Sequence, residues 1–64
     1  LEHIRIIERE KGLDSLSAGL KEIAEVRREN PYATLKELGE IIDLSKSGVN
    51  HRLRRIKKIA QNLT

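Results

Sequence analysis

Side chains suited to binding a polyanion gather in the last twenty residues of the chain. Residues 45–64 hold six Lys/Arg and no acid, a charge of +6, whereas residues 1–44 hold seven Lys/Arg and ten Asp/Glu, a charge of −3. A concentrated positive end on a small domain favours nucleic acid as its partner. The alternative is a basic, solvated surface that has no partner.

The residue types of segment 46–60 match the chemistry of base recognition. Asn can form two hydrogen bonds with adenine and Arg two with guanine, while Ser or His can bond to base acceptors or phosphates. Helix N-termini can also hold phosphates. The base contacts that we expect come from Lys46, Ser47, Asn50, His51 and Arg54. The phosphate contacts that we expect come from Thr34, Lys36, Arg52, Arg55, Lys57 and Lys58.

The sequence offers little for catalysis, metals or membranes. The chain has no Cys, its two His residues (His3 and His51) are far apart, and its Ser residues have no general base in a familiar pattern. We therefore expect no enzyme activity, no cofactor and no metal. The sequence shows neither an apolar run of roughly 20 residues, as a membrane span needs, nor a signal-peptide pattern. We expect a cytoplasmic, nucleoid-associated protein.

Two adjacent helical segments, 35–42 and 46–60, position these side chains. Thr34 and Glu37 have the spacing of a capping box, and Ser45 is the expected N-cap of the second segment. Only Asp43 and Leu44 separate the first helix from that cap, and so short a connection favours the steep crossing of a helix-turn-helix. The apolar stripes of the two segments comprise Leu35, Leu38, Ile42, Val49, Leu53, Ile56 and Ala60.

Two further helices are expected before this pair, which makes the chain a small all-α domain of about four helices. Segment 1–11 has a stripe that ends at the stop signal Gly12, and segment 16–30 has one that ends before Pro31. Ser15 or Ser17 is the expected cap of the second segment, and Arg27 on its stripe is expected to extend to solvent. The two stripes comprise Leu1, Ile4, Ile7, Leu16, Leu20, Ile23 and Ala24.

We expect a structural role for three residues in or between the paired helices. Gly39 is expected where the two helix axes cross closely, because a side chain there would collide with the second helix. Gly48 is expected to let the backbone approach the nucleic acid. Asp43 occupies a turn position where Gly is usual, and Asp tolerates the left-handed conformation better than most residues.

The stretches 30–40 and 44–56 carry a family resemblance. The run Ser-Lys-Ser-Gly-Val-Asn-His-Arg-Leu-Arg, residues 45–54, is its most specific part, and roughly residues 12–60 are covered. The sequence resembles the C-terminal helix-turn-helix domain of the WhiA family, DNA-binding regulators of sporulation and cell division. The helix pair also resembles region four of sigma factors, which reads promoters. Arg52 departs from the general motif, which places an apolar residue there, and this leaves the rotation of the second helix open by a fraction of a turn.

The resemblance implies a larger protein with double-stranded DNA as its partner. Family members carry a preceding domain similar to LAGLIDADG homing endonucleases, so residues 1–11 are expected to end a connecting helix from a missing N-terminal part. Residues 12–64 are then the DNA-binding domain. The alternative is a protein-interaction module that docks a sigma factor, RNA polymerase or the other domain of the parent chain. RNA binding is a further alternative, but single-stranded RNA readers usually offer stacking aromatics, and Tyr32 is the one aromatic residue.

Overall fold

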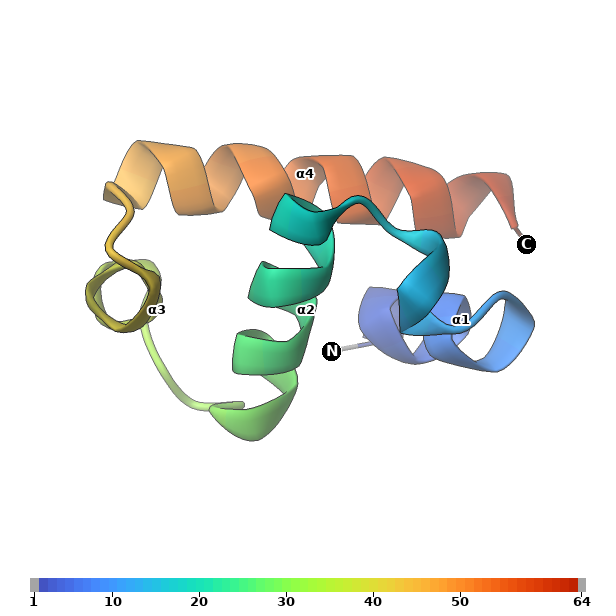
Figure 1. Ribbon diagram of the computed structural model, residues 1–64, viewed down its shortest axis with the longest axis horizontal. Helices are drawn as coiled ribbons and strands as arrows, with labels where there is room; N and C mark the ends of the chain where they lie inside the picture. Colours follow the sequence, from blue (N-terminus) through green and yellow to red (C-terminus); the bar gives the residue numbers. More distant parts are fainter. Residues whose placement is uncertain (1, 64) are drawn as a thin grey trace.

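Four α-helices and one short 3-10 turn make up the fold in the computed structural model, which describes residues 2–63. The elements are α1 (Glu2–Glu10), η1 (Leu13–Ser15), α2 (Ala18–Glu29), α3 (Leu35–Ile42) and α4 (Lys46–Asn62). Figure 1 shows α4 as the longest helix, running along one side of the molecule with the other three beneath it. No strand occurs within residues 2–63. The all-α helix-turn-helix prediction is confirmed.

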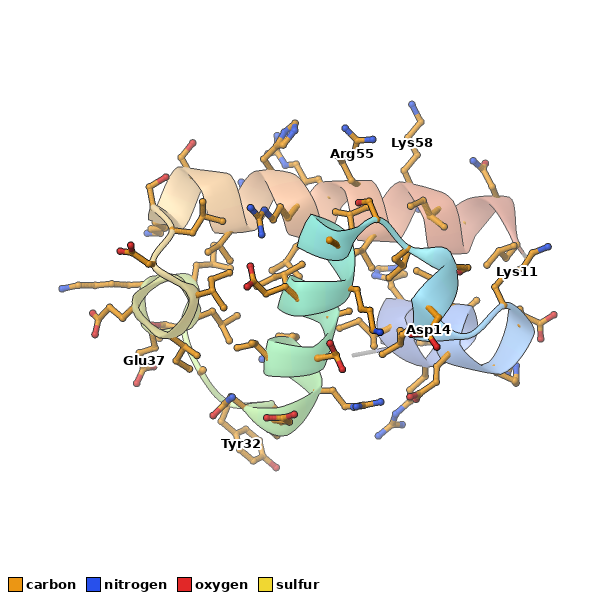
Figure 2. The ribbon with its side chains drawn as sticks, in the orientation of Figure 1. Lys11, Asp14, Tyr32, Glu37, Arg55 and Lys58 are labelled. Atoms are coloured by element: carbon orange, nitrogen blue, oxygen red, sulfur yellow. The ribbon has the colours of Figure 1, made fainter. Side chains whose placement is uncertain are left out.

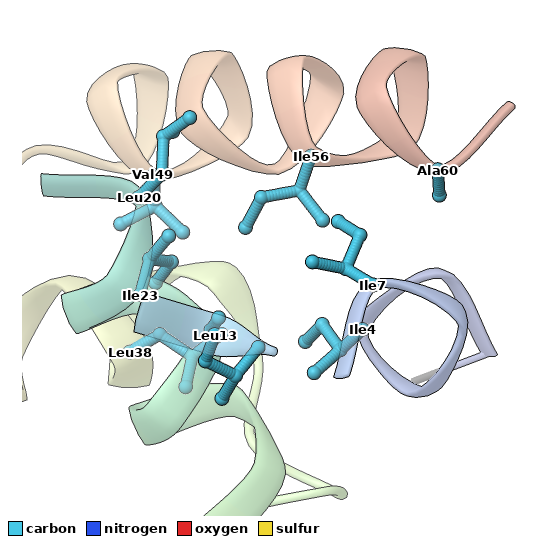
Figure 3. Close-up of a cluster of buried hydrophobic side chains, with 10 residues drawn as sticks. Ile4, Ile7, Leu13, Leu20, Ile23, Leu38, Val49, Ile56 and Ala60 are labelled. Atoms are coloured by element: carbon cyan, nitrogen blue, oxygen red, sulfur yellow. The ribbon is translucent and has the colours of Figure 1, made fainter. Parts of the chain in front are cut away.

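The core lies between α4 and the other helices and is wholly apolar. Figure 3 shows the cluster, in which Ile7, Ile23, Leu38, Val49 and Ile56 are the largest fully buried side chains. No polar side chain is buried among the described residues. The complete buried set is Ile4, Ile7, Leu13, Leu20, Ile23, Ala24, Leu38, Val49, Ile56 and Ala60. Because α4 contributes only one stripe to this core, its opposite side is left to solvent.

Helix α1 shares this core. Ile4 and Ile7 are buried in the common cluster, and α1 packs against α4. The helix stops as predicted at Gly12, whose φ is +82° and whose amide donates to the Ile7 carbonyl at 2.8 Å. Leu1, the first member of the predicted stripe, lies outside the described residues. The expected boundary at residue 12 therefore does not divide the core, and a connection from α1 to a further N-terminal part stays a prediction.

Helix α2 ends before Pro31 as predicted, but it differs from the prediction at its start and in the role of Arg27. It starts at Ala18 rather than residue 16, because Leu13–Ser15 form an unpredicted 3-10 turn, after which Leu16 and Ser17 are extended. Ser17 occupies the cap position but makes no side-chain cap bond. Arg27 does not extend to solvent: its Nη1 donates to the carbonyl oxygens of Asn30 (3.2 Å) and Pro31 (2.6 Å), where the helix ends. Arg27 therefore closes the C-terminus of α2.

The connection between α3 and α4 has the predicted turn chemistry. Asp43 adopts the left-handed conformation, with φ 55° and ψ 52°. The Leu44 amide then donates back to the Gly39 carbonyl at 2.8 Å, and Ser45 Oγ accepts from the Gly48 amide at 3.1 Å. The chain thus turns from α3 into a capped α4 within three residues.

Two glycines of this pair are each required by Leu44. A Cβ on Gly39 would overlap the Leu44 carbonyl oxygen, which confirms the close crossing. A Cβ on Gly48 would come within 2.8 Å of Leu44 Cγ. The absence of a side chain at Gly48 therefore has a cause within the fold; an approach of nucleic acid to the backbone at Gly48 stays a prediction.

We predict that Gly39→Ala destabilises the domain, because the overlap is with backbone and cannot be relieved by a rotamer change. Overpacking costs up to about 3 kcal/mol and the better helix propensity of Ala returns about 1 kcal/mol, so the net loss is about 2 kcal/mol. Urea unfolding followed by circular dichroism measures it. The control is Gly19→Ala, whose added Cβ would lie 3.4 Å from Arg52 Cζ, an ordinary contact. Equal stability of the two variants would contradict the close crossing.

Candidate nucleic-acid interface

The outer side of α4 carries most of the predicted DNA contacts. At 100° per residue, Ser47, His51, Arg54 and Lys58 lie opposite the buried stripe of Val49, Ile56 and Ala60, and all four are exposed. Figure 2 shows Arg55 and Lys58 projecting from α4 away from the other helices. Lys46 and Lys57 are also exposed, whereas Asn50 is half-buried at the edge of this side. The structure thus places the five predicted base-contacting residues on one helix, with four of them exposed and Asn50 half-buried.

Most cations of α4 have no side-chain partner within residues 2–63. Lys46, Arg54, Arg55, Lys57 and Lys58 make no ion pair or hydrogen bond through their side chains with any other residue of the range 2–63. Cations elsewhere are paired more often, as in Arg28 with Glu8 and Lys21 with Asp14. The unpaired positive charge of the domain is therefore concentrated on α4. A surface whose exposed side chains are positively charged produces an electrostatic field that attracts a polyanion.

Lys36 and Lys46 flank the turn between α3 and α4. Both line a shallow surface hollow together with Glu40, Asp43 and Ser45. The hollow is of mixed charge, so the positive surface is interrupted at the turn. Lys36 lies in the first turn of α3, on the exposed side of that helix, as its predicted phosphate contact requires.

Thr34 is the N-cap of α3, as the sequence predicted. Its Oγ1 accepts from the Glu37 amide at 3.1 Å, and its own amide donates to Glu37 Oε1 at 2.8 Å. The hydrogen bond from the Thr34 amide and the hydrogen bond of the Thr34 side chain together hold the pKa of the Glu37 carboxyl below its ordinary value of 4.5. The capping box fixes the start of α3; a phosphate contact by Thr34 stays a prediction.

Arg52 is the predicted contact that the structure places elsewhere. Its side chain turns toward α2, where Nη1 donates to the Gly19 carbonyl and to Glu22 Oε1, each at 3.1 Å. Arg52 is therefore engaged within the domain and does not lie on the outer side of α4. No local sequence pattern predicts this contact, because the partners of Arg52 lie 33 and 30 residues away in the sequence.

Two structural features bear on other site types. Within residues 2–63, no group of three or more His, Cys, Asp or Glu side chains is placed to hold a metal ion. In the same range, no helix has the length and apolar character needed to cross a membrane.

Comparison with known proteins identifies the family. The family model of the WhiA C-terminal HTH domain matches residues 1–60. The chain belongs to this family. It is 60% identical to the probable cell division protein WhiA of Halothermothrix orenii, over 98% of this chain and 21% of that protein. The proteins of the same name from Clostridium perfringens and Geobacillus thermodenitrificans are each 54% identical, with the same coverage.

The WhiA relatives are much longer than this chain, which spans about a fifth of their length. No solved structure matches the chain significantly. The match begins at residue 1 and so includes α1, whose Ile4 and Ile7 are buried in the common core. Family and fold together support a DNA-binding helix-turn-helix module.

We predict a pH dependence of stability from the capping box. Because the pKa of Glu37 is lowered in the folded state, its contribution is present above the unfolded pKa and is lost as the pH falls through the folded pKa. The wild-type domain should therefore lose more stability than Glu37→Gln when the pH falls from 5 to 3. Urea unfolding at several pH values measures the difference. Parallel stability curves for the two proteins would show that Glu37 contributes nothing through its charge.

Proposed function

We propose that this domain binds duplex DNA sequence-specifically, with α4 as the recognition helix in the major groove. The observation that carries the proposal is the set of five cations on α4 that have no partner within residues 2–63. They lie on a helix that follows a tightly crossed helix-turn-helix. Proteins of this type insert the second helix into the groove while the first crosses the backbone.

The dimensions of α4 suit this role. An α-helix with its side chains is about 10–12 Å wide and the major groove is about 12 Å wide, so α4 fills the groove with its outer side. Its 17 residues span about 25 Å, which is too long for every turn to follow a curving groove. Base contacts are therefore assigned to the N-terminal half, through Lys46, Ser47, Asn50, His51 and Arg54. Arg55, Lys57 and Lys58 are assigned to phosphates.

Duplex DNA suits this surface better than single-stranded RNA. Single-strand readers stack bases on aromatic side chains, and the one aromatic residue, Tyr32, is absent from α4. Tyr32 is 97% exposed in the α2–α3 connection, and Figure 2 shows it on the side of the molecule away from Arg55 and Lys58. The proposed surface therefore offers charge and hydrogen bonds but no stacking platform.

The proposal extends to the longer protein. The relatives are named for cell division, and we infer that this module serves a regulator of cell division and sporulation in the cytoplasm, at the nucleoid. A LAGLIDADG-like N-terminal domain and contacts with a sigma factor or RNA polymerase are part of the same proposal. The contacts with a sigma factor or RNA polymerase would be tested by co-purification with the full-length protein. If neither protein co-purified, DNA binding by this domain would be unaffected.

We predict that two classes of substitution on α4 behave differently. Asn50→Ala and Arg54→Ala should reduce the preference for the selected sequence over random DNA, by about 1–3 kcal/mol for Arg54 if it pairs bidentately with guanine. Arg55→Ala and Lys58→Ala should weaken binding to all sequences about equally and reduce the slope of log K against log salt by about one. Fluorescence anisotropy at several salt concentrations measures both quantities.

Arg9→Ala is the matched control for charge, because the Arg9 side chain is 70% exposed on α1 and, within residues 2–63, pairs only with the adjacent Glu10. It should leave the slope and the preference unchanged. Duplex binding by the wild type that does not depend on salt would contradict the proposed function. If Asn50→Ala kept the full preference, the assignment of this residue to base contact would be wrong.

A further inference from the structure

Arg52 ties the recognition helix to α2. Its Nη1 reaches the Gly19 carbonyl in the first turn of α2 and Glu22 Oε1 about one turn later. The Arg52 side chain is 29% exposed, compared with 52% for Glu22. The guanidinium lies close over Gly19, since a Cβ there would be 3.4 Å from Arg52 Cζ. Arg52 is the one cation of α4 that another described element holds.

The apolar contacts of α4 and its crossing with α3 set the side of the helix that faces the core, but apolar burial alone sets the rotation of α4 about its own axis less exactly than hydrogen bonds do. Val49, Ile56 and Ala60 form a narrow buried stripe, with Leu53, Ile59 and Leu63 partly buried beside it, and burial is non-directional. A small roll would keep this stripe against the core. Arg52 lies beside the stripe, about 60° from Val49 and about 40° from Ile56 at 100° per residue. Its hydrogen bonds have preferred distances and angles, so they restrain the roll that burial leaves free.

The size of such a roll decides whether it matters for recognition. A roll of about 20° moves an atom about 6 Å from the helix axis by about 2 Å. Binding constellations tolerate displacements of only about 0.5 Å. A roll too small to expose Val49 would therefore misplace Asn50 and Arg54 relative to a base edge.

We propose that Arg52 is a positioning residue that sets the rotation of α4, and thereby the sequence preference, without contacting DNA. This inference rests on the proposed function, and it replaces the phosphate contact expected of Arg52 from the sequence. Because Glu22 neutralises Arg52, releasing it to a phosphate would leave Glu22 unpaired. As a positioning residue, Arg52 contributes to preference and not to counterion release.

The test compares Arg52→Ala with Arg55→Ala, a neighbouring and exposed cation of the same helix. The probes are a duplex selected by the wild-type domain from random DNA and a duplex of random sequence. Arg52→Ala should lower the preference for the selected duplex about fivefold or more, the loss of roughly one good base contact, with the salt slope unchanged. Arg55→Ala should lower the slope by about one, with the preference unchanged. A lower slope with full preference in Arg52→Ala would overturn the proposal.

Substitution of the partner separates the two roles of Arg52 more sharply. If Arg52 is a positioning residue, Glu22→Ala lowers the preference for the selected duplex. Glu22→Gln largely keeps that preference, because the amide oxygen still accepts the hydrogen bond from Arg52. The double variant Glu22→Ala with Arg52→Ala then has the same preference as Arg52→Ala alone. If Arg52 were a phosphate contact, Glu22→Ala would free it, and the salt slope would steepen with preference unchanged. Glu22→Gln and Glu22→Ala also serve if Arg52→Ala fails to fold by circular dichroism.

Failure of the proposed function gives a different result. If the wild type selects no preferred duplex, sequence-specific binding is wrong, and the restraint on rotation is tested in the free domain. Backbone residual dipolar couplings should then show α4 rolled relative to α2 in Arg52→Ala and unchanged in Arg55→Ala. Identical couplings in wild type and Arg52→Ala would overturn the positioning role.

Discussion

The close crossing of α3 and α4 is the constraint on which the rest of the domain depends. Gly39 and the Leu44 carbonyl approach so closely that no Cβ fits between them. The left-handed Asp43 and the bond from the Leu44 amide to the Gly39 carbonyl hold the chain in that approach. Once the crossing is set, Val49 faces the core, and the opposite side of α4 must face solvent.

The remaining helices stabilise the long helix that leaves this crossing. Helix α3 packs near the start of α4, α2 crosses beneath it, and α1 supports it with Ile4 and Ile7 (Figures 1 and 3). A chain of 64 residues has little apolar surface to bury, and one shared core makes α4 the common partner of all three helices. This arrangement leaves an unpaired basic side on the helix that is held from below, which is what a rigid recognition surface requires.

The sequence predicted local chemistry well and distant contacts poorly. Several predicted roles involve partners only a few residues apart, so residue types and spacing were sufficient to predict them. These are the roles of Thr34 with Glu37, Gly39, Asp43 and Ser45. Arg52 bonds to an element 30 or more residues away, and only the packed helices bring the two together. The 3-10 turn before α2 and the contact of Gly48 with Leu44 are local and were still missed, because neither has a strong residue signature.

The outer side of α4 is the surface that we propose meets duplex DNA. Amide chemical-shift mapping of this domain during titration with duplex DNA tests it most directly. We expect the largest changes in α4 around Ser47, His51 and Arg54 and at the start of α3, with small changes in α1 and around Tyr32. Changes centred on α1, on the acidic side of α2 or on Tyr32, with α4 unaffected, would contradict the account.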